Sequence, residues 1–191
     1  IYMNSVVYLN GAKIGEWKYG YTRFSLELTG MLLEGENELM VSVTFQSPNS
    51  RWYSGAGINR NVWLMETKAL CIPDGGVYTH AGKAADGGWE LRVETEMLGP
   101  AEEISAEAEL HLYDGDNEVF PSSAEEAEPL AAVQGHAACK VLHFAPEAGI
   151  CVWDLEDPKL YRLQVQLRVP DGALLQEENL RIGFRETAFD P

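Results

Sequence analysis

Apolar and polar residues alternate along much of this chain, which is the pattern of β-strands that bury one face. The alternation is clearest in residues 22–29, 38–45, 107–113 and 160–169. No long stretch has the periodicity of an amphipathic helix, and strands do not alternate with helical segments. We therefore predict an all-β protein.

The first part of the chain, residues 1–68, contains five predicted strands. They cover residues 6–9, 12–17, 22–29, 38–45 and 61–66. Asn10 and Gly11 separate the first two, and Asn-Gly is the strongest two-residue signal for a β-hairpin. Five strands are few for a closed jelly roll, which has about eight. We therefore expect an incomplete sandwich whose open face is covered by further strands or by a second copy in a homo-oligomer.

The second part, residues 69–191, is predicted to form an immunoglobulin-like β-sandwich. Strands are expected at residues 77–80, 89–97, 104–113, 140–144, 160–169 and 180–186, with turn signals between them. This fold has about seven short strands in roughly 100 residues, close to the six expected here. We predict an acidic loop at residues 121–129. At residues 114–118 we predict a hairpin turn rather than a calcium-binding loop.

The net charge of −16 is concentrated in the second part. Residues 1–68 hold six of the 14 basic and six of the 30 acidic residues, so their charges balance. This shift in composition predicts a boundary near Lys68, between domains at 1–68 and 69–191. An acidic surface repels phosphate backbones, and the chain has no apolar run of 18 residues. We therefore expect neither a nucleic-acid partner nor a membrane span.

A glycine-punctuated loop, RWYSGAGINRNVWL at residues 51–64, combines arginines with aromatic side chains. Arg51 and Arg60 carry planar guanidinium groups that suit carboxylates, carbonyls or sugar hydroxyls. Trp52 and Tyr53 are apolar enough to anchor the loop on a neighbour. Arginine and aromatic residues are enriched at interfaces generally, so the loop is interpreted either as a binding loop or as a clamp between domains.

Three further aromatic residues, Trp17, Tyr19 and Tyr21, are close together in the sequence. Aromatic side chains with a polar group can stack on a pyranose ring, so these three are candidates for sugar binding. Packing in a core or against another domain is the alternative interpretation.

Patterns for catalysis, metal binding and cofactor binding are weak. Adjacent glutamates occur at residues 102–103, 125–126 and 177–178. Neighbours in a strand point to opposite faces, so no catalytic pair of carboxylates is expected. His136 would lie across the pleat from Cys139 and His143, which argues against a zinc site. No phosphate-binding loop, nucleophile elbow or zinc-protease motif occurs, so we predict no metal and no cofactor.

Three segments resemble glycoside hydrolase family 2, the group of β-galactosidases, β-glucuronidases and β-mannosidases. Residues 6–43, from VVYLNG to GENELMVSV, resemble the later half of that family's sugar-binding-like N-terminal jelly roll. NSRWYSGAGINRNVWL, at residues 49–64, is similar to the segment that closes this domain. WDLEDPKLYRLQVQL at 153–167 and RIGFRE at 181–186 resemble the end of the immunoglobulin-like middle domain.

The resemblance implies a partial galactose-binding-like jelly roll followed by an immunoglobulin-like sandwich. Family members hydrolyse glycosidic bonds with retention, using two glutamates on a (β/α)8 barrel that has no counterpart in this chain. The chain would then be an interior fragment of a longer glycosidase, here called the parent enzyme, and inactive by itself. An independent carbohydrate-binding module and a purely structural pair of sandwiches are the alternatives.

The same resemblance implies the partners and the places of the candidate residues. The partners would be the carbohydrate substrate of the parent enzyme and its catalytic barrel. Arg51, Trp52, Tyr53 and Arg60 would lie at the edge of the active site or between domains.

Overall fold

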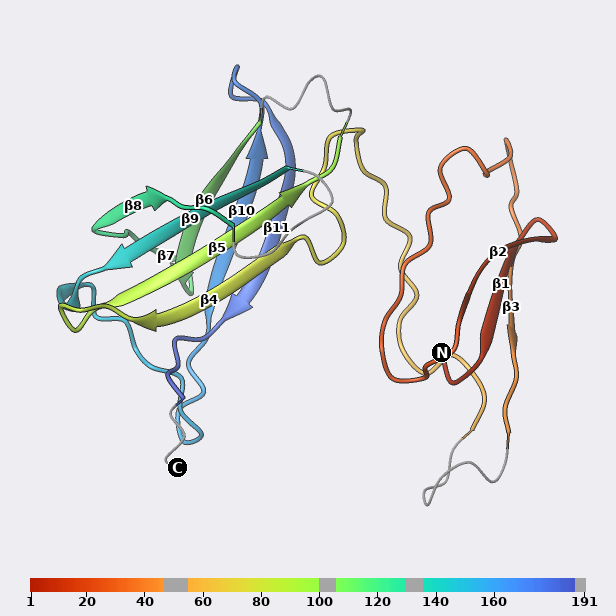
Figure 1. Cartoon of the computed structure of the whole chain (residues 1–191), viewed down its shortest axis with the longest axis horizontal. Coiled ribbons are helices and arrows are strands. Elements are labelled where there is room, and N and C mark those ends of the chain that lie inside the picture. The colour runs from red at the N-terminus through yellow and green to blue at the C-terminus, as the bar shows by residue number, and fades with distance from the viewer. Residues whose placement is uncertain (47–54, 100–105, 130–135, 188–191) are drawn as a thin grey trace. The chain divides into compact units, whose positions relative to one another are not determined.

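The computed structural model describes residues 1–46, 55–99, 106–129 and 136–187. It divides into two compact units, Ile1–Met65 and Glu66–Pro191 (Figure 1). The described residues form antiparallel strands and one short 3-10 helix, Pro146–Ala148. The predicted all-β class is therefore confirmed. No helix in the described ranges is long and apolar enough to cross a membrane.

The first unit is built on one antiparallel sheet with the strand order β2-β1-β3. Its strands are β1 (Ser5–Leu9), β2 (Ala12–Trp17) and β3 (Leu39–Val43). Asn10 and Gly11 join β1 to β2 with φ values of 52° and 81°. Positive φ at both central residues is the geometry of a tight hairpin turn, which Asn and Gly tolerate best. The predicted hairpin is therefore confirmed.

Residues 22–29 were predicted to form a strand, and this prediction is wrong for the backbone but right for the side chains. Residues 23–28 have no strand assignment. Phe24 nevertheless stacks on Trp17, with 5.5 Å between ring centroids, and Leu26 lies directly over Gly15. The alternation indicates that one face is half-buried, not that the backbone pairs with a neighbouring strand. Residues 61–66 also lack the predicted strand.

The second unit is a sandwich of two four-stranded sheets, with orders β4-β5-β9-β8 and β11-β10-β6-β7. The strands are β4 (Val77–Lys83), β5 (Trp89–Met97), β6 (Glu107–Asp114), β7 (Asn117–Val119), β8 (Ser123–Glu126), β9 (His136–Phe144), β10 (Tyr161–Arg168) and β11 (Leu174–Ile182). Taken in chain order, they correspond to strands A, B, C, C′, D, E, F and G of an immunoglobulin-like domain, with sheets ABED and GFCC′. The predicted sandwich is confirmed.

The acidic segment at residues 121–129 is not only a loop, and this corrects the prediction. Ser123–Glu126 forms β8, an edge strand that pairs with β9. All four of its residues are exposed, so neither face needs apolar side chains and no alternation marks the strand in the sequence. Residues 114–118 form the turn between β6 and β7, as predicted, with Asp114 opposite Asn117.

The core of the second unit lies between its two sheets and centres on Phe184. This ring makes edge-to-face contacts with Trp89, Phe144 and Tyr161 at centroid distances of 5.5, 5.9 and 5.3 Å. The inward residues of β10 are fully buried while the outward ones are not, as the period of a strand requires. Burial of this many apolar side chains gives the second unit a rigid frame.

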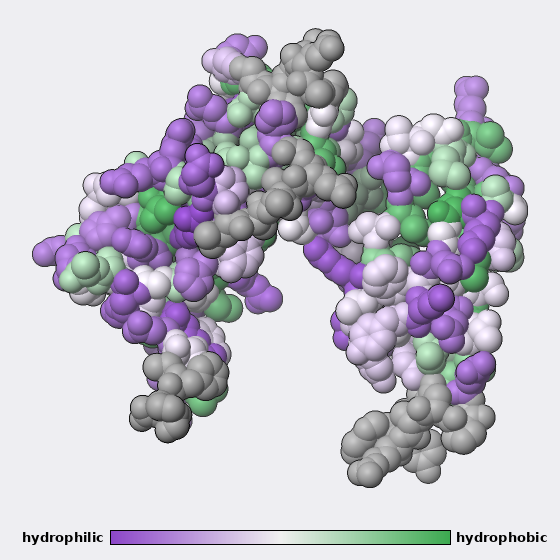
Figure 2. All heavy atoms as spheres, in the orientation of Figure 1, coloured by the Kyte–Doolittle hydropathy of each residue, from purple (hydrophilic) through white to green (hydrophobic). Residues whose placement is uncertain are grey.

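The first unit buries far less. Among its described residues, only Val7 and Leu9 are buried hydrophobic side chains. Apolar side chains are visible on its surface in Figure 2. The large exposed ones are Trp17, Tyr19, Tyr21, Met31, Leu32, Leu33, Leu39, Met40, Ile58, Val62, Trp63, Leu64 and Met65. Such an amount of exposed apolar surface is typical of an interface with another polypeptide.

Candidate functional site

The arginine and aromatic loop is described only in part. Arg51, Trp52 and Tyr53 lie outside the described residues, and Arg60 is exposed. The middle of the loop is paired with Tyr2 at Gly57, whose N–H donates to the Tyr2 carbonyl at 3.1 Å and whose carbonyl accepts the Tyr2 N–H at 3.0 Å. Gly57 has φ of 140°, a conformation that other residues rarely adopt. This bridge places Gly57 next to a group of aromatic rings.

That group, the aromatic cluster, consists of Tyr2, Tyr19, Tyr21 and Phe45. Tyr21 makes edge-to-face contacts with Tyr2 at 5.4 Å and with Tyr19 at 5.6 Å, and Phe45 lies 6.3 Å from Tyr2. Gly20 is buried beneath Tyr2, because a Cβ atom there would come within 2.1 Å of the ring. The structure thus brings Tyr19 and Tyr21 together, and adds two rings that are distant in the sequence.

Trp17, the third predicted stacking residue, makes contacts of its own. Its ring is stacked on Phe24 with an angle of 18° between the planes, and its Nε1–H donates to Thr22 Oγ1 at 3.1 Å. Tyr19 and Tyr21 are inclined to each other by 64°. A flat sugar platform needs rings with open, roughly parallel faces. The rings of Trp17, Tyr19 and Tyr21 do not form one such platform.

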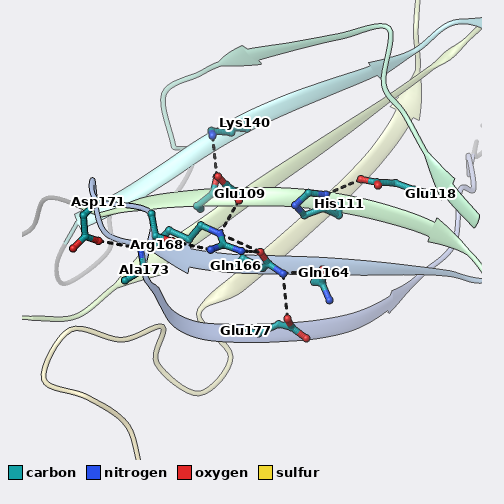
Figure 3. A network of polar contacts seen from close by, with 12 residues as sticks. Glu109, His111, Glu118, Lys140, Gln164, Gln166, Arg168, Asp171, Ala173 and Glu177 are labelled. Atoms are coloured by element: carbon teal, nitrogen blue, oxygen red, sulfur yellow. Dashed lines mark hydrogen bonds and ion pairs between the residues drawn. The ribbon is translucent and has the colours of Figure 1, made fainter. Parts of the chain in front are cut away.

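The outer face of the β11-β10-β6-β7 sheet carries a network of polar side chains, which we call the polar face (Figure 3). Arg168 lies at its centre. Its Nε is 2.8 Å from Glu109 Oε2, and its Nη2 donates to Gln166 Oε1 at 2.6 Å. A third bond runs from Nη1 to the carbonyl of Gly172 at 2.8 Å. The guanidinium group is therefore held by three neighbours.

The glutamates of the polar face are also paired. Gln166 donates from Nε2 to Glu177 Oε2 at 3.2 Å, and Asn179 donates to the other oxygen of Glu177 at 2.8 Å. These amide donors, Asn179 first, lower the pKa of Glu177. His111 Nδ1 lies 2.6 Å from Glu118 Oε1. The two amide donors of Glu177 favour its ionised carboxylate, whereas a general acid must keep its proton near neutral pH.

The adjacent glutamates of β11 do not act together. Glu177 is bound to Gln166 and Asn179 on the outer face, whereas Glu178 accepts a bond from Gln176 at 2.7 Å. Gln176 in turn brackets the backbone of Ile72 with two bonds of 2.8 and 3.0 Å. Glu177 and Glu178 thus have different partners, as expected for neighbours on opposite faces of a strand.

The cysteine and histidines of β9 have separate environments. Cys139 is buried and His136 is exposed. Burial raises the pKa of the Cys139 thiol, which makes it unreactive while the unit is folded. His143 Nε2 lies 3.0 Å from Asp86 Oδ2, and the Gly88 N–H and His143 together lower the pKa of Asp86. No group of three or more His, Cys, Asp and Glu residues in the described part of the chain is placed to hold a metal ion.

The second unit matches a known protein family. Residues 76–185 match the sequence model described as glycosyl hydrolases family 2. The chain belongs to glycosyl hydrolase family 2. The match begins just before β4 and ends just after β11. The part of this family 2 chain that matches the family's sequence model is therefore the immunoglobulin-like sandwich.

Relatives with assigned names agree with this family. A β-galactosidase of Bacteroides ovatus is 33% identical over 198 residues, which cover 100% of the family 2 chain and 22% of the relative. A β-galactosidase of Priestia megaterium is 25% identical, covering 94% of the chain and 18% of the relative. The chain thus spans about a fifth of the length of the curated relatives that it matches.

Solved structures show the same arrangement of strands. A β-glycosidase from Bacteroides vulgatus is 26% identical with a TM-score of 0.78, over 100% of the family 2 chain and 23% of that protein. A family 2 member from Bacteroides cellulosilyticus is 27% identical with a TM-score of 0.78, over 99% of the chain and 26% of that protein. Both units of the chain therefore have counterparts within much larger glycosidases.

Proposed function

We propose that this chain forms non-catalytic β domains of a β-galactosidase-like glycosidase, which hydrolyses O-glycosidic bonds in carbohydrate metabolism. The main support is the full-length match to a β-galactosidase of which the chain covers 22%. The acid/base and nucleophilic glutamates would then lie on a barrel outside the chain. On the polar face, the amide groups of Asn179 and Gln166 lower the pKa of Glu177, which suits a structural role for this glutamate.

The proposed chemistry of the parent enzyme is hydrolysis with retention of configuration. That mechanism needs two carboxyl groups about 5 Å apart, one of which keeps its proton near neutral pH. It also needs a rigid scaffold that holds both groups. The second unit would serve the reaction indirectly, by fixing the barrel on a closely packed sandwich.

The supporting role draws on the contrast between the two units. The second unit is closed around its own core, whereas the first exposes many large apolar side chains. In the parent enzyme, that exposed surface would be covered by further parts of the polypeptide. Arg60 and the rest of the loop at residues 51–64 would contribute to such an interface or to the edge of the active site.

The proposed function predicts a clear difference between the chain and the parent enzyme. With nitrophenyl β-galactoside as substrate, the parent enzyme should release nitrophenol, whereas the 191-residue chain should give no turnover above the buffer rate. The glucuronide and mannoside provide the matched substrates, and galactoside should be preferred. Turnover by the chain that a point mutation within it abolishes would contradict the proposal.

The exposure of Tyr19 and Tyr21, 59% and 60%, leaves one specific alternative to test, an independent carbohydrate-binding module. Because their rings and that of Trp17 do not form one flat platform, we expect titration calorimetry with galactose and short oligosaccharides to show no binding tighter than about 1 mM. Trp17→Ala is the matched variant and should change nothing. Micromolar binding that Trp17→Ala removes would favour the module instead.

A further inference from the structure

The loop between β9 and β10 exposes apolar side chains at one end of the second unit. Val152, Leu155 and Leu160 are 46%, 84% and 42% exposed. We call these three residues the end patch. Single exposed leucines are ordinary, but three large aliphatic side chains within nine residues of one loop are not explained by the core of the sandwich.

The loop that carries the end patch is held in place at several points. The Cys151 N–H donates to the Tyr161 hydroxyl at 2.8 Å, and the Trp153 N–H donates to the Phe184 carbonyl at 2.9 Å. Asp154 Oδ1 accepts the N–H of Glu156 at 3.0 Å, which closes a tight turn around Leu155. Leu155 is thus presented by a fixed backbone, so its burial in a partner would cost little ordering entropy.

The same end of the unit carries the segment that follows β11. Arg185 lies over the Trp153 ring at 4.8 Å, and a Cβ atom at Gly183 would be 3.1 Å from the Cβ of Trp153. The chain therefore passes beside the end patch as it leaves the sandwich. A domain that follows the described residues closely in the sequence would begin at this end of the second unit.

We propose that the end patch docks on the catalytic barrel of the parent enzyme, with Leu155 inserted into an apolar recess of the barrel. This inference rests on the proposed function. It is supported by the length of the relatives, of which the chain covers about a fifth, and by the path of the chain after β11, where a Cβ atom at Gly183 would lie 3.4 Å from Leu160 Cδ2. Glu156 and Asp157, which directly follow Leu155, are both exposed, so the recess should have basic side chains at its rim.

Cys151 provides a native probe for this contact because it is exposed and adjacent to Val152. In the parent enzyme, maleimide labelling of Cys151, followed by peptide mass mapping, should be slow. Leu155→Asp should release the patch and speed the labelling by about tenfold or more, the change that corresponds to losing one buried leucine. Cys139, which is buried, should stay unlabelled in both proteins.

Phe120→Asp is the matched control, because Phe120 is 71% exposed and follows β7, away from the β9–β10 loop in the sequence. It should leave the labelling of Cys151 unchanged.

Equal labelling rates in the wild-type and Leu155→Asp enzymes would overturn the docking, and the proposed function would stand if both still hydrolyse galactoside. Protection that depends on protein concentration would overturn it too, since a second copy would then cover the patch. A parent enzyme without glycosidase activity would refute the proposed function independently of the labelling.

Discussion

Replacing Phe184 with alanine is expected to destabilise the second unit by about 3–5 kcal/mol, the cost of removing a large aromatic side chain from a core. Phe184 is 0% exposed and contacts three aromatic rings from β5, β9 and β10. The cavity left by the Phe184 ring would therefore lie between the two sheets of the sandwich. Urea unfolding can be followed by alkylation of Cys139, whose buried thiol reports on the second unit alone.

Phe120→Ala is the control for this experiment because it removes the same atoms from a side chain that is 71% exposed. Its effect should stay within about 0.5 kcal/mol, as for most surface substitutions. If the two variants unfolded at the same urea concentration, the aromatic group around Phe184 would not be the centre of the core.

Much of the fold could be predicted because strands that bury one face alternate in the sequence. β10 is the clearest case, since every second residue from Tyr161 is buried. β8 could not be predicted in this way, because its four residues are all exposed and its only role is to pair with β9. Residues 22–29 show the opposite case. Their sequence alternates because the side chains pack on the sheet, although the backbone is not paired with a strand.

The candidate site was less predictable, because it depends on contacts between distant residues. Tyr19 and Tyr21 are close in the sequence, but Tyr2 and Phe45 join them only through the fold of the first unit. Gly20, between the two tyrosines, was the available signal, since a buried glycine often marks a close approach of another side chain. The polar face depends on the register of four strands, which local sequence does not define.

The second large effect is expected at Gly88, where alanine should destabilise the second unit by about 1–3 kcal/mol through overpacking. A Cβ atom at Gly88 would lie 2.2 Å from the carbonyl oxygen of Phe144, a backbone atom that cannot rotate away. To make room, β9 would have to move, and Phe144 packs against Phe184 in the core. The same urea assay with Cys139 alkylation would measure the loss.

Gly82→Ala is the matched control, because the closest atom to a Cβ there is His80 Nε2 at 3.8 Å, an ordinary contact. It should have little effect.

Gly88 also donates its N–H to Asp86 Oδ1 at 2.9 Å, the main cause of the lowered pKa of Asp86. A carboxyl with a lowered pKa stabilises the fold above its ordinary pKa and loses that contribution as the pH falls through the folded value. Gly88→Ala should therefore raise the pKa of Asp86 towards its ordinary value, measured by NMR titration. An unchanged pKa together with unchanged stability would mean that the turn tolerates a side chain at Gly88.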